Sequence, residues 1–135
     1  MIDQLVLDAS SAIRISMEAP ESEASLAAIL HADRTCVPAL FMSETAHAVL
    51  RHVRAGDLEP SEAQERLLRC IRLVDGIGDD RALASKALSR ALELGLSAYD
   101  AAYLELAREL SCPLVTLDRR LGHAARSVGV EVLGH

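Results

Sequence analysis

Short apolar runs alternate along the chain with longer segments in which apolar residues recur at helical spacing. The short runs are bounded by prolines, glycines or polar residues, which is typical of strands in a buried sheet. They predict strands over residues 5–7, 35–37 and 114–117, with shorter candidates at 73–74 and 130–132. The spacing in the longer segments predicts helices over residues 23–31, 40–54, 60–72, 81–94 and 98–110.

Strands that alternate with helices favour an α/β fold around a mostly parallel central sheet. Gly56 and Gly95 are expected to end helices. The segment 76–81 begins like a dinucleotide-binding loop but lacks the third glycine, so it predicts a loop before a helix capped by Asp79 or Asp80. No repeat or linker interrupts the pattern, and we expect a single domain over residues 1–135.

The composition of the chain limits the functions that it can have. The chain has 14 Lys plus Arg against 20 Asp plus Glu, and the net charge of −6 is the wrong sign for holding nucleic acid by charge alone. A nucleic-acid role therefore requires a cation. Three cysteines without a CxxC pair indicate reduced thiols of a cytoplasmic protein. Neither a signal peptide nor an apolar segment of about 18 residues is recognisable, so we expect no membrane association.

Two acids stand where apolar runs end. Asp8 follows the first strand candidate, and Asp118 follows the run at 114–117. Ligand sites of open α/β sheets lie outside the carboxyl ends of their strands. The alternative for both residues is that they only cap the helices that follow.

Two further acids lie within apolar helical segments. Asp100 shares a helix face with Tyr103 and Leu104, whereas Glu105 and Arg108 are expected to face solvent. Glu44 stands alone in an apolar stretch and needs a partner. Simple structural alternatives are that Asp100 completes a capping box with the serine three residues earlier, and that Glu44 is a first-turn acid favoured by the helix dipole.

If the four carboxylates converge, they repel one another by about 4 kcal/mol for a pair at 4 Å and an effective dielectric near 20. Either some of them are protonated or a divalent cation lies among them. Ligands that are all oxygen favour Mg²⁺ or Mn²⁺. Such an ion can activate water for attack on phosphorus, so the pattern predicts phosphodiester hydrolysis.

The sequence also resembles a known family. The segments Val-Leu-Asp-Ala-Ser-Ser-Ala at 6–12, Leu-Ser-Ala-Tyr-Asp-Ala-Ala-Tyr at 96–103 and Leu-Val-Thr-Leu-Asp at 114–118, together with Glu44, resemble the PIN-domain family and its VapC-like ribonuclease toxins. The resemblance covers essentially the whole chain. It implies an α/β/α sandwich and an acidic pocket that binds Mg²⁺ or Mn²⁺ and cleaves RNA endonucleolytically.

Carried over residue by residue, the resemblance makes Asp8, Glu44, Asp100 and Asp118 the catalytic, metal-binding acids. Ser10 matches a small polar residue that assists the first acid, and Thr116 matches one that precedes the fourth. Some members have a further carboxylate after the fourth acid, where this chain has Arg119 and Arg120. These arginines are candidates for phosphate contacts, with a solvated helix start as the alternative.

The resemblance further implies a homodimer silenced by a cognate antitoxin protein. The segment 23–31 is more apolar than one buried face requires; we expect it to pack mainly in the core, with contact to another chain as the alternative. Two alternatives to a ribonuclease are compatible with some of these residues. An Asp8-nucleophile phosphohydrolase would use Lys86, the only lysine, but has Ser10 where its second aspartate belongs. A non-catalytic PIN-like scaffold would bind RNA or protein without cutting.

Overall fold

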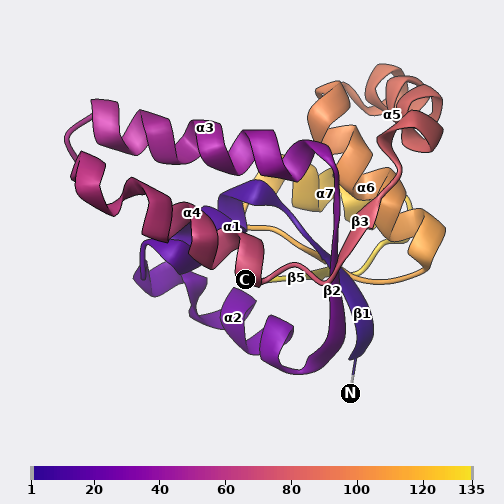
Figure 1. The fold of residues 1–135 in the computed structure, drawn as a ribbon. Helices are drawn as coiled ribbons and strands as arrows, with labels where there is room; N and C mark the ends of the chain where they lie inside the picture. The colour runs from indigo at the N-terminus through magenta and orange to yellow at the C-terminus, as the bar shows by residue number, and fades with distance from the viewer. Residues whose placement is uncertain (1, 135) are drawn as a thin grey trace.

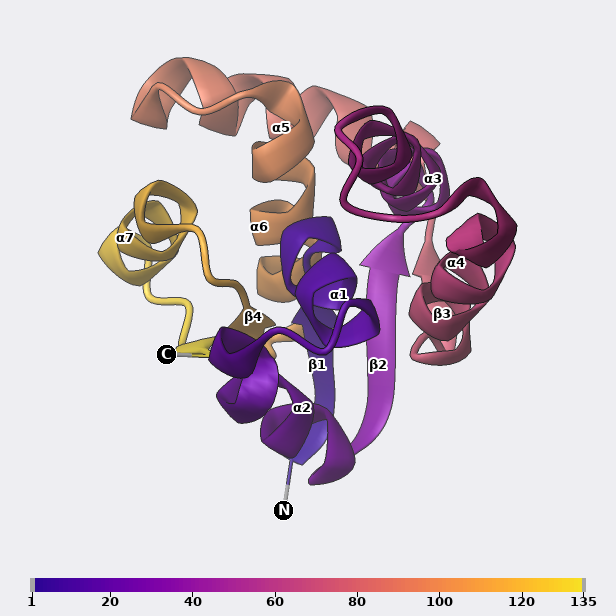
Figure 2. The same ribbon diagram turned by 90° about the vertical axis from the view of Figure 1, so that its left-hand side faces the viewer.

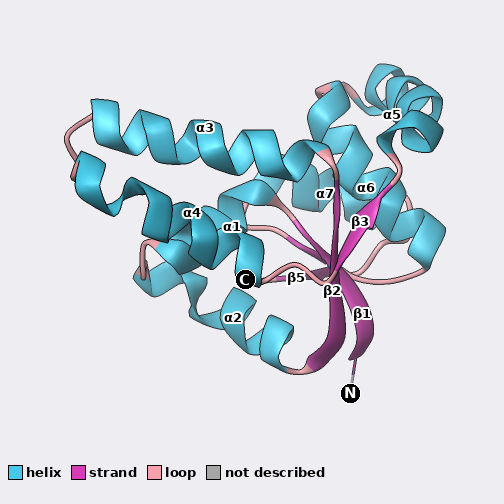
Figure 3. Cartoon of the chain, in the orientation of Figure 1, coloured by secondary structure: helices cyan, strands magenta, loops and turns pink. Residues whose placement is uncertain are grey.

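A computed structural model describes residues 2–134. Within them, five strands form one sheet. The strands are β1 (Ile2–Leu7), β2 (Ala32–Pro38), β3 (Gly76–Gly78), β4 (Leu114–Val115) and β5 (Val132–Leu133). Their order across the sheet is β3-β2-β1-β4-β5, and every described pair is parallel. Figure 3 shows the strands, in magenta, gathered between the helices. The predicted α/β fold is confirmed, and the sheet is wholly parallel in this part of the chain.

Helices cover both faces of the sheet, which gives the predicted α/β/α sandwich (Figures 1 and 2). Helices α1 to α4 lie on one side, α5 and α6 lie on the other, and α7 packs beside α6 and β5. The helices are α1 (Ala9–Ser16), α2 (Glu23–Leu30), α3 (Leu40–Arg54), α4 (Ala63–Arg72), α5 (Asp80–Leu94), α6 (Ala98–Leu110) and α7 (Arg119–Ser127), with 3-10 turns η1 (Pro20–Ser22) and η2 (Pro60–Glu62).

The central strand explains why the short runs are apolar throughout. Leu5, Val6 and Leu7 of β1 are fully buried, because helices cover both faces of a parallel sheet. Phe41 and Tyr103 are the largest side chains of this core.

The chain reverses direction across the sheet between β1 and β4. It first adds β2 and β3 on one side of β1 and later adds β4 and β5 on the other. Leu7 is paired with Val115, and the Asp8 N–H donates to the Val115 carbonyl at 3.1 Å. The carboxyl ends of β1 and β4 therefore lie side by side at the switch point, where ligand crevices form in such sheets.

Three strand predictions need correction. The run at 73–74 is not a strand, because the Leu73 N–H continues the turn of α4 by donating to Cys70. The strand is Gly76–Gly78, which the sequence pattern had predicted as a loop; glycine is a poor strand former in general. Here a Cβ at Gly78 would lie 3.0 Å from Leu106, so glycine lets α6 pack closely against this edge. The strand candidates at 130–132 and 114–117 become β5, Val132–Leu133, and β4, Leu114–Val115.

The helix predicted over residues 23–31 is present as α2, but the expectation that it packs mainly in the core is wrong. Ser25 is its buried residue, and Leu30 is 75% exposed. The segment predicted as one helix over 60–72 divides into η2 and α4. Helices α3 and α6 have the predicted bounds, and Gly95 ends α5 in the left-handed conformation, at φ 70°.

The described residues contain no helix long and apolar enough to cross a membrane. The three cysteines are free thiols, with Cys36 and Cys70 buried.

Candidate active site

Asp8 is held in a fixed orientation directly after β1. The residue is 5% exposed, and both carboxylate oxygens accept hydrogen bonds. Oδ1 accepts from the Ser11 N–H and from the Ser10 hydroxyl, each at 2.8 Å, and Oδ2 accepts from the Thr116 hydroxyl at 2.5 Å. Asp8 therefore caps α1, as its alternative interpretation predicted, and also faces the end of β4.

Thr116 joins the two strand ends. While its hydroxyl donates to Asp8, the same oxygen accepts the Asp118 N–H at 3.0 Å. The Asp118 Oδ1 in turn caps α7, accepting the N–H groups of Arg120 and Leu121 at 2.9 and 3.1 Å. Asp118 is exposed, and no described hydrogen bond involves its second oxygen, which is free to bind a ligand.

Asp100 lies in the first turn of α6. The Ser97 hydroxyl caps this helix by accepting the Asp100 N–H at 3.0 Å, so the serine half of the predicted capping box is present. Burial raises the pKa of Asp100, and the negative charges of Asp118 and Asp8 raise it further. Asp100 is therefore within electrostatic range of both strand-end acids.

Glu44 comes from α3 and approaches the same place. It lies in the second turn of the helix, which contains no acid in its first turn, so the first-turn interpretation of Glu44 is wrong. Its Oε1 accepts the Tyr103 hydroxyl at 2.7 Å. Burial raises the pKa of Glu44; the Tyr103 hydrogen bond lowers it, while the charges of Asp100 and Asp8 raise it.

Thr116 joins Asp8 to Asp118, the charges of Asp100 and Asp8 act on Glu44, and those of Asp118 and Asp8 act on Asp100. The four predicted acids therefore converge on one region at the carboxyl edge of the sheet. Among the described residues, however, no three acidic, histidine or cysteine side chains are close enough to hold a metal ion directly as they stand. The two observations are compatible, because Mg²⁺ keeps several water ligands and binds through one or two carboxylates. The donor set is oxygen throughout, which fits a hard divalent cation.

The two arginines after Asp118 are placed differently. The Arg120 guanidinium donates to the Gly95 carbonyl, and its positive charge lowers the pKa of Asp100. Arg120 therefore lies at the edge of the acid cluster. Arg119 is exposed and makes no side-chain hydrogen bond or ion pair with the described residues.

With this geometry in place, comparison with known proteins is decisive. The PIN domain, as a sequence family, matches residues 5–127, a range that includes all four acids. The chain belongs to the PIN-domain family. The predicted resemblance is thereby confirmed.

Two proteins of Pyrobaculum aerophilum are similar to this PIN domain, one in sequence and one in fold. The protein named Ribonuclease VapC3 is 30% identical over 120 residues, which cover 87% of this chain and 92% of the relative. The crystal structure of PAE2754 superposes with a TM-score of 0.75 at 23% identity, covering 96% of this chain and 83% of the other. The first relative supports a VapC-like PIN domain, and the second supports the fold.

Tyr103 is a site residue to which sequence reasoning gave no role. It is 2% exposed, and its hydroxyl contacts Glu44 from the other side of the core. The signal was available, because Tyr103 lies three residues after Asp100 on the same face of the helix. A buried tyrosine needs a partner for its hydroxyl, and the unpaired acid Glu44 needs one as well.

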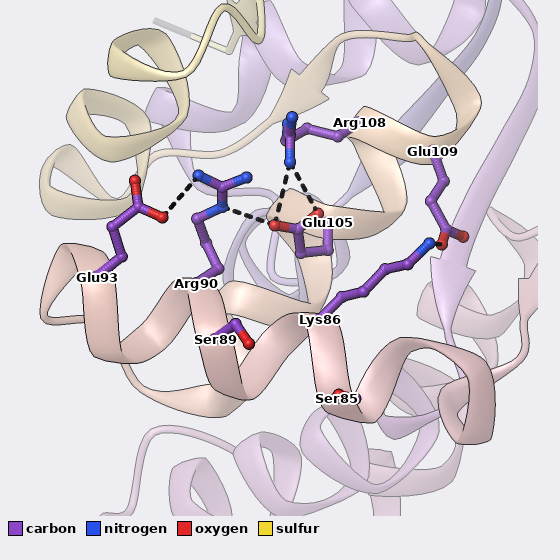
Figure 4. A pocket seen from close by; sticks show the side chains of 8 residues that line it. All are labelled: Ser85, Lys86, Ser89, Arg90, Glu93, Glu105, Arg108 and Glu109. Carbon is purple, nitrogen blue, oxygen red and sulfur yellow. Dashed lines mark hydrogen bonds and ion pairs between the residues drawn. The ribbon is translucent and has the colours of Figure 1, made fainter.

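The expectation that Glu105 faces solvent is wrong. Glu105 is 4% exposed and binds Arg90 at 2.6 Å and Arg108 at 3.3 Å in a cavity of about 480 Å³ between α5 and α6 (Figure 4). Helix α5 covers this face of α6, which the period of one helix alone does not reveal. None of the four acids lines this cavity.

The same cavity bears on the phosphohydrolase alternative. Lys86 lies there and pairs with Glu109 at 2.5 Å (Figure 4). Asp8 does not line this cavity, so the only lysine is not placed to bind a phosphate that Asp8 would attack. Ser10, at the position of the missing second aspartate, serves as a hydrogen-bond donor to Asp8.

Proposed function

We propose that this PIN domain is a divalent-metal-dependent endoribonuclease that hydrolyses RNA phosphodiester bonds. The observation that carries the proposal is the convergence of four carboxylates from four separate segments at the switch point of a parallel sheet, where burial and the neighbouring negative charges raise the pKa values of Glu44 and Asp100. Such repulsion is costly in a metal-free protein, and a bound cation relieves it. The similarity to Ribonuclease VapC3 supports RNA as the substrate.

The residues that would hold Mg²⁺ or Mn²⁺ are Asp8, Glu44, Asp100 and Asp118. When bound, the ion would supply a nucleophilic water and stabilise charge on the phosphate. The protein's own contribution is orientation. Hydrogen bonds from neighbours of such ligands fix their rotamers, and losing them typically reduces metal affinity or activity about 10–100-fold.

Each acid has its own support. Ser10 and Thr116 hold the two oxygens of Asp8, so this carboxylate keeps one rotamer. Tyr103 orients Glu44 and favours its ionised form, because a hydroxyl that donates to a carboxylate stabilises the negative charge. Arg120 supplies a positive charge beside Asp100 without binding its carboxylate. Arg119 remains a candidate for contact with the RNA backbone.

We further propose that the nuclease is the toxin of a toxin–antitoxin pair, acts in the cytoplasm and forms a homodimer. The VapC-like sequence supports the antitoxin partner. The exposed surface of α5 supports the dimer: Leu88 and Leu92 lie one turn apart and are 57% and 79% exposed. Exposed leucines at this spacing are typical of a helix that packs against a second chain.

Cleavage of a total-RNA pool by the purified protein in Mg²⁺ or Mn²⁺ tests the nuclease. Asp100→Asn should abolish cleavage without unfolding the protein, and chelation by EDTA should do the same. Asp33→Asn is the matched control, since Asp33 is an exposed acid near the amino end of β2, at the opposite edge of the sheet. Cleavage by Asp100→Asn at the wild-type rate would overturn the assignment, and folded wild-type protein that cuts no RNA would favour the scaffold alternative.

A further inference from the structure

A groove leads away from the acid cluster between α1 and α3. It has a volume of about 520 Å³, and Ser10 and Glu44 lie at its inner end. Ser10 is the residue that donates to Asp8, so the groove opens directly from the proposed catalytic acids. Its volume lies within the range of about 300–1,000 Å³ that is usual for small-molecule sites.

One face of α3 forms a wall of this groove. Glu44, Ala48, Arg51 and His52 line it, at the four- and seven-residue spacings that share a helix face. A second hollow of about 210 Å³ shares Ala48, Arg51 and His52 and continues past Ala55. The track therefore follows α3 outwards, and Arg51 lies about 10 Å along the helix axis from Glu44 at a rise of 1.5 Å per residue.

The lining combines an apolar floor with positive charge. Ile13 and Met17 of the α1 segment face Ala48 across the groove. Arg14 and the acid Glu21 also line it, and their opposite charges pair at 3.3 Å. Arg51 forms no ion pair with any acid in residues 2–134, so its charge is available to a ligand.

This arrangement matches a chain in which flat, weakly polar groups alternate with phosphates. We propose that the groove binds the nucleotide next to the scissile phosphate of single-stranded RNA, with its base or ribose on the apolar floor and the neighbouring phosphate on Arg51. The inference rests on the proposed nuclease function. Arg51 lies about 10 Å along α3 from Glu44, so its guanidinium is placed for a neighbouring phosphate rather than for the one being cut.

Single-stranded RNA fits the size of the groove better than a duplex does. The groove is the size of a small-molecule site, whereas double-stranded RNA is recognised across two successive minor grooves over about 16 base pairs. Apart from His52, its lining contains no aromatic side chain on which bases could stack. Arg51 and the apolar floor therefore position the strand through backbone charge and shape, and base identity contributes little.

The test compares Arg51→Gln with Arg54→Gln. Both arginines are exposed on α3, and Arg54 lines neither hollow of the track. Cleavage of a single-stranded RNA oligonucleotide that the wild type cuts is followed over a series of monovalent salt concentrations. For single strands, the slope of log affinity against log salt is about −0.7 for each phosphate contact. We expect Arg51→Gln to raise KM, leave kcat within about twofold, and flatten that slope for kcat/KM by about 0.7.

A second pair of variants tests the apolar floor. Ala48→Leu fills the groove, whereas Ala46→Leu places the same side chain on an exposed face of the same helix. Alanine and leucine have similar helix propensities, so neither change should disturb α3. Ala48→Leu should raise KM for single-stranded RNA several-fold, and Ala46→Leu should behave as the wild type.

Several results would overturn the inference. If the wild type shows chelator-sensitive cleavage but Arg51→Gln has the same salt slope and KM as Arg54→Gln, the groove does not bind substrate although the nuclease function stands. If Arg51→Gln instead releases a copurifying protein and leaves the RNA kinetics unchanged, the groove binds a protein segment. A wild type that cuts no RNA overturns the inference together with the proposed function.

Discussion

Replacing Thr116 with valine removes the hydroxyl that joins the ends of β1 and β4. The side chain is fully buried, donates to Asp8 and accepts from the Asp118 N–H. Valine has nearly the same shape, so the change removes two hydrogen bonds and leaves the packing almost intact. It also leaves a buried carboxylate oxygen of Asp8 without its donor. An unpaired buried acceptor lowers the free energy of unfolding more than the loss of both partners does.

The magnitude follows from the two contacts. A hydrogen bond to a charged group contributes about 1.5–3 kcal/mol and a neutral one about 0.5–1.5 kcal/mol. We therefore expect the free energy of unfolding to fall by about 2–4 kcal/mol. An unfolding entropy of about 2.1 cal/mol/K per residue for 135 residues converts each kcal/mol into about 3.5 °C, so Tm should fall by about 7–14 °C.

Thr45→Val is the matched control. Thr45 is equally buried, but its hydroxyl donates to the carbonyls of Phe41 and Met42 within α3. A hydroxyl bonded back to its own helix adds little stability, because helical N–H groups already occupy these carbonyls. We expect a loss of about 1 kcal/mol or less.

Thermal unfolding in EDTA measures both variants without metal, and RNA cleavage in Mn²⁺ measures their activity. Thr116→Val should lower kcat/KM by about 10–100-fold, as expected for a residue that orients a metal ligand, and Thr45→Val should keep activity within about twofold. The reasoning is refuted if the two variants lose equal stability, or if Thr116→Val unfolds at a lower temperature yet cleaves RNA at the wild-type rate.

Three further predictions concern other parts of the molecule. Glu105→Ala removes a buried carboxylate that binds Arg90 and Arg108, while Arg90 keeps its exposed partner Glu93, and should destabilise the protein by about 1.5–3 kcal/mol in urea unfolding. Glu109→Ala, which removes an exposed pair with Lys86, should cost about 1 kcal/mol or less, and equal losses would contradict a stabilising role of Glu105. The pKa of Asp100 is raised in the folded state, so the ionised carboxylate destabilises the fold at pH values above its unfolded-state pKa. Asp100→Asn should therefore stabilise the metal-free protein at pH 7 and lose this advantage below about pH 4, where the carboxyl group is protonated in both states. A Tm difference between variant and wild type that is independent of pH would refute this. Tyr103→Phe keeps the ring but not the hydrogen bond to the cluster, and should weaken Mn²⁺ binding about 10-fold in calorimetry with the fold intact; unchanged affinity would exclude an orienting role.

The sequence predicts those elements whose pattern is local. Helices α3 and α6 carry a regular stripe of apolar residues, and their bounds follow from it. The caps by Asp8 and Asp118 follow from acids placed directly before a helix. The sequence does not predict strand β3. Its glycines Gly76 and Gly78 permit close packing against neighbours that are distant in the sequence, which no local pattern reveals.

The candidate site also combines features that the sequence predicts with features that it does not. The four acids are visible in the sequence because each interrupts an apolar stretch. The sequence names Ser10 and Thr116 as supporting residues, but it does not pair Thr116 with Asp8 or Tyr103 with Glu44, because these contacts span 108 and 59 residues. For Glu105 the sequence prediction is wrong. The residue lies on the polar face of α6 and would be exposed on that helix alone, but in the fold Arg90 from α5 covers it.

Mn²⁺ binding to the RNA-free protein tests most directly the claim that four carboxylates form one cation site. The measurement is an isothermal titration, paired with the Tm of the same samples, on the wild type, Asp100→Asn and Asp33→Asn. The wild type and Asp33→Asn should bind Mn²⁺ saturably, and Tm should rise by about 9 °C at a hundredfold excess over Kd, which corresponds to about 2.7 kcal/mol. Asp100→Asn should lose most of this response. Equal binding by Asp100→Asn, or a wild type that cleaves RNA in EDTA with no Mn²⁺ bound, would contradict the account.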